Sequence, residues 1–142
     1  MKTFYLCMLA VLWLTGCTGY VHKMVREDGV LFTAGELVHD KGESNRLVLE
    51  MSNQRYEAHG FTVVRETNLA ELRKRYISNP KHWGRVFSGL NTEHVVYSFE
   101  TAAKSADGHE ISCRLIWNSG AKPAGVCTDK EGTEFPVRFE QH

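Results

Sequence analysis

The strongest constraint on the fold of this chain is an alternation of apolar and polar side chains with a period of two residues. After Glu110, apolar side chains occupy every second position at Ile111, Cys113, Leu115 and Trp117. Successive side chains of a β-strand point to opposite faces, so this pattern predicts a strand with one face in the core. The same period recurs in three further segments, residues 46–51, 94–101 and 133–139. The alternation therefore predicts a mainly β protein.

Short turn clusters separate the apolar segments and limit how the predicted strands connect. Asp107-Gly108 is a dipeptide typical of tight hairpins, and Asp, Gly, Ser and Asn cluster after most of the other segments. Connections this short favour antiparallel neighbours over crossovers through a helix. Two further strands are expected over residues 29–38 and 55–65, the second with a bulge or a close approach at Gly60.

One short helix and one edge strand complete the predicted fold. Asn68 is a suitable N-cap and Glu71 follows three positions later, as in a capping box. The helix is expected to end before residues 79–80, because a residue that precedes proline disfavours the α conformation. Pro136 has no backbone N–H, so the last strand is expected at an edge. We expect a small antiparallel barrel or sandwich of about seven strands with one short helix inserted.

Three residues after the predicted helix are candidates for ligand contact. His82, Trp83 and Arg85 bring an imidazole, an indole and a guanidinium close together in the sequence. Such a set could stack on a sugar or on a phosphorylated headgroup. Trp83 and Phe87 could instead fill the core where the chain re-enters the sheet, and we favour this second interpretation.

The N-terminus carries a signal of another kind. Lys2 precedes an apolar run over residues 4–14, which is too short to span a bilayer, since a transmembrane helix needs about 20 apolar residues. The sequence Leu-Thr-Gly-Cys follows at residues 14–17. In its charge, its apolar length and its small residue before cysteine, this segment resembles the lipobox signal peptide of bacterial lipoprotein precursors. The alternative is an ordinary secretory signal with a coincidental cysteine.

This resemblance implies where the mature chain begins and how it is held. Cleavage would follow Gly16, and Cys17 would carry a diacylglycerol thioether and, in many species, a further amide-linked acyl chain such as palmitate. Two or more acyl chains hold a protein stably on a membrane. In enterobacterial lipoproteins, Asp after the cysteine favours the inner membrane. Thr18 stands here, so the outer membrane, facing the periplasm, is expected. The chain would divide into a signal peptide (1–16), an acylated N-terminus and tether (17–28), and a single β-rich periplasmic domain (29–142).

The lipoprotein interpretation leaves two cysteines for the folded domain. Cys7 would leave with the signal peptide, and Cys17 would be acylated. Cys113 and Cys127 remain, and in an oxidising periplasm we expect them to form one structural disulfide. A redox-active or metal-binding pair is the weaker interpretation, because the spacing is not Cys-x-x-Cys.

The end of the chain carries a second, looser resemblance. Turn residues, cysteines and apolar positions follow one another over residues 107–113, 125–129 and 132–139. Their order is similar to that at the end of small uncharacterised lipoproteins from Gram-negative bacteria. This likeness implies a shared fold and carries no activity with it.

Charge and motifs argue against several functions. The chain has 17 basic and 17 acidic residues, a balance that disfavours nucleic acid as a partner. It contains no Gly-x-Ser-x-Gly, no His-Glu-x-x-His and no phosphate-binding glycine loop. A metal site built from His59, His94 and His109 would have to assemble in space, because no two histidines have a ligand spacing. We expect no catalytic residues, no cofactor and no metal.

Three functions are then compatible with the sequence. The first is a non-enzymatic cell-envelope lipoprotein whose β domain binds a protein partner or supports an assembly. The second is a periplasmic inhibitor or immunity lipoprotein that acts on a muralytic enzyme or a toxin. Membrane-bound lysozyme inhibitors share this size and anchor, but their Ser-x-x-Gly-x-x-Tyr motif is absent here. The third is a small-ligand carrier or hydrolase that uses the region around Trp83. We favour the first.

Overall fold

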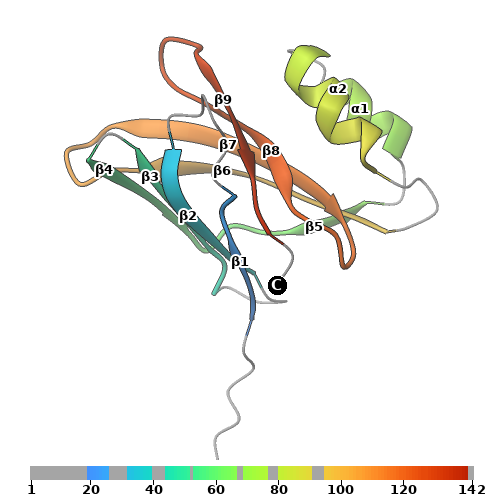
Figure 1. The fold of residues 1–142 in the computed structure, drawn as a ribbon, viewed down its shortest axis with the longest axis horizontal. Coiled ribbons are helices and arrows are strands. Elements are labelled where there is room, and N and C mark those ends of the chain that lie inside the picture. Colours follow the sequence, from blue (N-terminus) through green and yellow to red (C-terminus); the bar gives the residue numbers. More distant parts are fainter. Residues whose placement is uncertain are drawn as a thin grey trace, which may run out of the picture.

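The fold is a curled antiparallel sheet that carries two short helices on its outer face (Figure 1). The computed structural model describes residues 19–25, 32–39, 44–51, 53–66, 69–76, 80–90 and 95–140. Its strands are β1 (Tyr20–Lys23), β2 (Phe32–His39), β3 (Arg46–Met51), β4 (Gln54–His59), β5 (Val64–Glu66), β6 (Val96–Lys104), β7 (Glu110–Asn118), β8 (Ala124–Thr128) and β9 (Glu134–Arg138). Its helices are α1 (Leu69–Tyr76) and α2 (Pro80–Ser88).

The strands form one sheet in the order β1-β2-β3-β4-β6-β7-β8-β9, and β5 also pairs with β6. The sheet curls until its two end strands meet. Met24 forms an isolated β-bridge with Phe139. The N–H of Val25 donates to the carbonyl oxygen of Arg138 at 2.8 Å, and the N–H of Glu140 donates to the carbonyl oxygen of Lys23 at 2.7 Å. The result is a partly closed barrel, and it confirms the prediction of a mainly β antiparallel fold.

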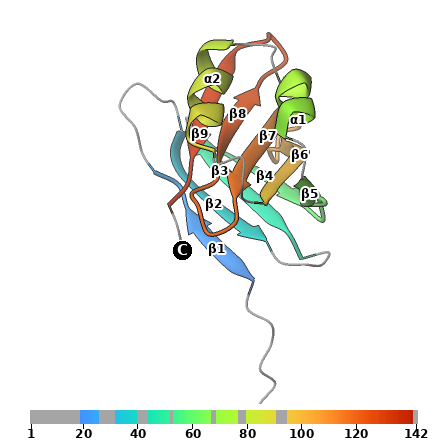
Figure 2. The ribbon, with the colours of Figure 1, turned by 90° about the vertical axis from the view of Figure 1, so that its right-hand side faces the viewer.

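The strands bury side chains on both faces of the sheet. The inner face holds a large apolar cluster that includes Ile111, Cys113, Leu115 and Trp117, the alternating residues of β7. The outer face of β6 to β8 is covered by the helices, as Figure 2 shows from the side. That second cluster consists of Leu72, Trp83, Phe87, Val96, Ile116 and Val126.

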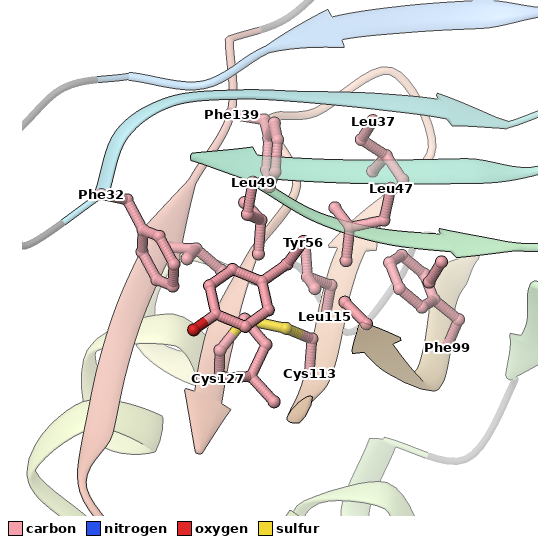
Figure 3. Packing of buried hydrophobic residues seen from close by; sticks show 14 of the residues in the cluster. Phe32, Leu37, Leu47, Leu49, Tyr56, Phe99, Cys113, Leu115, Cys127 and Phe139 are labelled. Carbon is pink, nitrogen blue, oxygen red and sulfur yellow. A yellow bond between two sulfur atoms is a disulfide. The ribbon is translucent and has the colours of Figure 1, made fainter. Parts of the chain in front are cut away.

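The predicted disulfide forms across the β7–β8 pair. Cys113 and Cys127 are register partners, both fully buried, with Cα atoms 4.0 Å apart. Figure 3 shows the bond among the apolar side chains of the inner cluster, beside Leu115 and Tyr56. The expected edge position of the Pro136 strand is also confirmed, since β9 ends the strand order.

The predicted strand over residues 55–65 is interrupted at Gly60, where a bulge or a close approach was expected. β4 lies before the interruption and β5 after it, and both pair with β6. The register shifts by one residue between Glu57↔Lys104 and Val64↔Ser98, which is the signature of a bulge. Gly60 has φ of 70°, a conformation that glycine adopts without strain.

Two elements differ from the sequence-based expectation. Residues 80–88 form a second helix, because Trp83, Val86 and Phe87 make an apolar stripe at helical spacing and Pro80 suits a first helical position. The sheet begins at Tyr20 rather than near residue 29, so a tether reaching residue 28 was wrong. β1 lacked an apolar alternation because its only buried side chain is a histidine.

Candidate functional site

A cleft of about 580 Å³ opens in the barrel wall beside the bulge. Its walls come from residues 60–62 after β4 and from β5, β6 and α1, which are brought together only in the folded chain. Its lining residues are Gly60, Phe61, Thr62, Val64, Glu66, Arg75, Ser98, Phe99, Glu100 and Thr101.

The cleft exists because the bulged strand leaves part of β6 without a neighbour on one side. β5 pairs with β6 as far as Ser98, and β4 pairs with it at Lys104. Among the described strands, residues 99–103 of β6 therefore have register partners in β7 only. Bulges are common beside functional sites because they redirect side chains and end strand pairing.

The floor of the cleft is apolar and continuous with the inner core. Phe61 follows Gly60 and stacks on Phe99 of β6, with ring centroids 4.3 Å apart and an interplanar angle of 23°. Both rings are buried. Val64 stands above this floor and is 45% exposed, which is unusual for a large apolar side chain of this domain.

The rim of the cleft is charged and hydroxylated. Arg75 of α1 donates a hydrogen bond to Glu66 of β5 at 2.8 Å. On the other side, Arg114 lies 3.1 Å from the carboxylate of Glu100. An apolar centre inside a polar rim is the usual anatomy of a protein-recognition surface.

Of the three residues that were proposed as ligand contacts, the structure places Trp83 apart from His82 and Arg85. Trp83 is only 3% exposed and packs in the outer cluster, 6.1 Å from the ring of Phe87. His82 and Arg85 lie at a pocket of about 20 Å³ between α2 and the β8–β9 pair. A pocket of this size holds about one water molecule. The core role favoured for Trp83 thus agrees with its burial.

A carboxylate oxygen beside this small pocket lacks a partner. Oε2 of Glu134 is buried and has no hydrogen-bond partner among the described residues. Nε2 of His82 is 4.0 Å away, too far for a hydrogen bond.

A hydrogen-bonded histidine pair, of which His22 is buried, is the feature that sequence reasoning missed. His22 of β1 is 3% exposed, and its Nε2 lies 2.9 Å from Nε2 of His39 in β2. Nδ1 of His22 donates to the carbonyl oxygen of Glu140 at 2.8 Å. Because a carbonyl can only accept, Nδ1 carries the proton, and in the neutral pair His39 donates to His22. The rings stack, and Trp117 packs against His39.

The outer face of β1 to β4 carries a ladder of ion pairs around a groove of about 190 Å³. Glu36 accepts hydrogen bonds from Lys23 and Arg46. The hydrogen bond from Lys23 is the main cause that lowers the pKa of Glu36, and burial acts in the opposite direction. Arg55 in turn contacts both Glu50 and Glu57. These charges satisfy one another at the surface.

The remaining candidate residues are not brought together. His59 contacts Glu57, whereas His109 contacts Asp107 and Gln54 at the other end of β4. His94 and Cys17 lie outside the described residues. The part of the chain that the structure describes contains no group of three or more residues arranged to hold a metal ion.

Comparisons of this chain with protein-family models, with curated proteins and with solved structures give no match. Within the described ranges, neither helix is long and apolar enough to cross a membrane.

Proposed function

We propose that this chain is a lipid-anchored cell-envelope protein that acts without catalysis, as a binding or assembly module. The cleft beside the bulge at Gly60 is the observation that carries the proposal, and its partner is a segment of another protein. The anchor is Cys17, held in the outer membrane and facing the periplasm.

Two properties of the cleft support a protein partner. Exposed Val64, above the buried rings of Phe61 and Phe99, supplies an apolar centre that releases water on contact. The Glu66–Arg75 pair and Glu100 supply charges at the rim, where they set orientation and partner choice.

The anchor rests on the N-terminal signal and on the redox state of the domain. The Leu-Thr-Gly-Cys sequence at residues 14–17 supports acylation of Cys17. The buried Cys113–Cys127 disulfide fits an oxidising compartment such as the periplasm.

Labelled palmitate tests the anchor. Cys17→Ser should abolish incorporation of the label and yield a soluble or uncleaved protein. Cys7→Ser is the matched control and should label normally, because Cys7 lies in the cleaved segment. Normal labelling of Cys17→Ser would refute the lipoprotein assignment.

Photocrosslinking in intact cells tests the cleft. A photoreactive amino acid at Val64 should give a discrete crosslinked protein, whereas the same amino acid at Ala106, in the β6–β7 turn, should not. A muralytic enzyme or toxin in the adduct would replace the assembly role with an inhibitory one. Equal crosslinking from both positions would refute the cleft as the binding site.

A further inference from the structure

The first strand begins very close to the cysteine proposed as the anchor. β1 starts at Tyr20, three residues after Cys17. A fully extended chain advances at most about 3.6 Å per residue, so the Cα atoms of Cys17 and Tyr20 are within about 11 Å of each other. Acyl chains on Cys17 would therefore hold the strand itself at the membrane surface.

β1 is fixed to the barrel on both of its sides. All four of its residues pair with β2, from Tyr20↔His39 to Lys23↔Glu36. On the other side, the N–H of Glu140 donates to the carbonyl oxygen of Lys23, and Nδ1 of His22 donates to the carbonyl oxygen of Glu140. This strand is part of the folded domain and cannot serve as a spacer.

The beginning of β1 also presents apolar surface. Tyr20 is 53% exposed and Val21 is 41% exposed, and with Val64 they are the exposed large hydrophobic residues of the described chain. Tyr20 stacks on His39 with ring centroids 5.3 Å apart and remains more than half exposed. Tyrosine is enriched at membrane interfaces because its ring is apolar and its hydroxyl is polar.

We propose that the domain lies directly on the lipid bilayer, with Tyr20 and Val21 in the headgroup region. This inference rests on the proposed lipid anchor at Cys17. It fixes the orientation of the barrel, because the strand ends near Tyr20 face the membrane and the opposite ends face away. Figures 1 and 2 show the helices on the side of the molecule away from β1. In this orientation they are also held away from the lipid.

The strand registers identify the end that points away. Val21 pairs with Val38, Val38 pairs with Arg46, and Arg46 pairs with His59. His59 therefore lies at the same height along the strands as Val21. β4 then runs for six residues to Gln54, a length of about 17 Å at 3.4 Å per residue. Gln54 donates to Asp107 at 2.9 Å, so the β6–β7 turn lies at this far end. Ala106 in that turn is exposed and provides a distant reference position.

Fluorine NMR of the acylated protein in vesicles tests this orientation. Tyr20→Trp and Ala106→Trp proteins, labelled with 5-fluorotryptophan, are reconstituted into vesicles of phosphatidylethanolamine and phosphatidylglycerol with a headgroup spin label. The resonance added by Tyr20→Trp should broaden several-fold more than that added by Ala106→Trp. Buried Trp83 and Trp117 provide internal references for the native fold.

Flotation of the same vesicles separates the two possible failures. Protein that floats but shows equal broadening at both positions, or more at Ala106, overturns the orientation and leaves the anchor intact. Protein that does not float overturns the lipid anchor and this inference together.

Discussion

At the scale of single residues, Gly125 shows how closely β7 and β8 approach. A Cβ atom at this position would lie 1.9 Å from the carbonyl oxygen of Arg114 and 2.8 Å from the Cα of Leu115. Both obstacles are backbone atoms inside the central β7–β8 pair, so neither can rotate away.

We expect Gly125→Ala to lower the free energy of unfolding by about 3 kcal/mol or more, since overpacking against backbone forces the strands apart. Gly84→Ala is the control, because nothing lies within 4 Å of its added Cβ and alanine is the better helix former. That variant should gain about 0.5–1 kcal/mol. Urea unfolding measures both, and equal effects would contradict the strand geometry.

Glu36 should make the domain less stable in acid. The hydrogen bond from Lys23 lowers the pKa of Glu36 from its ordinary value of 4.5, so the folded state favours the ionised form. The stabilisation is complete above the unfolded pKa and is lost as pH falls through the lower, folded one. Glu36→Gln should therefore flatten the fall in unfolding free energy below about pH 5. Glu131→Gln, in the exposed β8–β9 turn, should follow the wild-type curve.

At the scale of elements, α2 decides between the two interpretations of Trp83. The indole fills the space between α2 and the outer face of the sheet. Trp83→Ala should lower the free energy of unfolding by about 3–5 kcal/mol, as expected for a buried tryptophan. Arg85→Ala, on the exposed side of the same helix, should change it by less than about 0.5 kcal/mol. Similar small effects from both variants would assign Trp83 to the surface.

Elements with a regular side-chain period could be predicted from the sequence. β3 was predicted with its observed bounds, and in β7 and β9 the predicted inward residues are those in the core. β1 was missed because its buried residue is His22, which gives no apolar period. α2 was missed because Gly84 and the polar residues around it obscure the apolar stripe.

The candidate site was out of reach for a different reason. The cleft depends on a one-residue register shift against β6, a distant partner that no local pattern reveals. Gly60 was the only local signal, and the bulge or close approach expected there corresponds to the observed register shift. The His22–His39 pair likewise depends on the β1–β2 register, which a sequence without apolar alternation could not supply.

At the scale of the whole molecule, the barrel depends on β1 for its closure. A soluble chain that begins at Met24 loses the β1–β2 pairing and leaves the carbonyl oxygen of Glu140 and the ring of His39 without His22. We expect it to lose at least about 2 kcal/mol of unfolding free energy, the cost of buried polar groups left unpaired.

A soluble chain that begins at Gly19 is the matched control for this truncation. It keeps every described residue of β1 and should unfold at the same urea concentration as the mature chain with Cys17→Ser. Equal stability of the chains beginning at Gly19 and Met24 would show that β1 contributes nothing to the barrel. In the chain that begins at Met24, the newly exposed edge of β2 should also promote aggregation, which light scattering can detect.

The contact between β1 and Glu140 also sets the order of events when the protein is made. His22 and Glu140 are 118 residues apart, so the first strand to be synthesised must wait for the last segment of the domain before the barrel can close. Contacts this distant in sequence form slowly because a long loop must be closed first. In the exported chain that we propose, the unfinished sheet would be exposed to periplasmic proteases and chaperones until translocation ends. Premature termination before β9 would then leave an open sheet, a ready substrate for quality control.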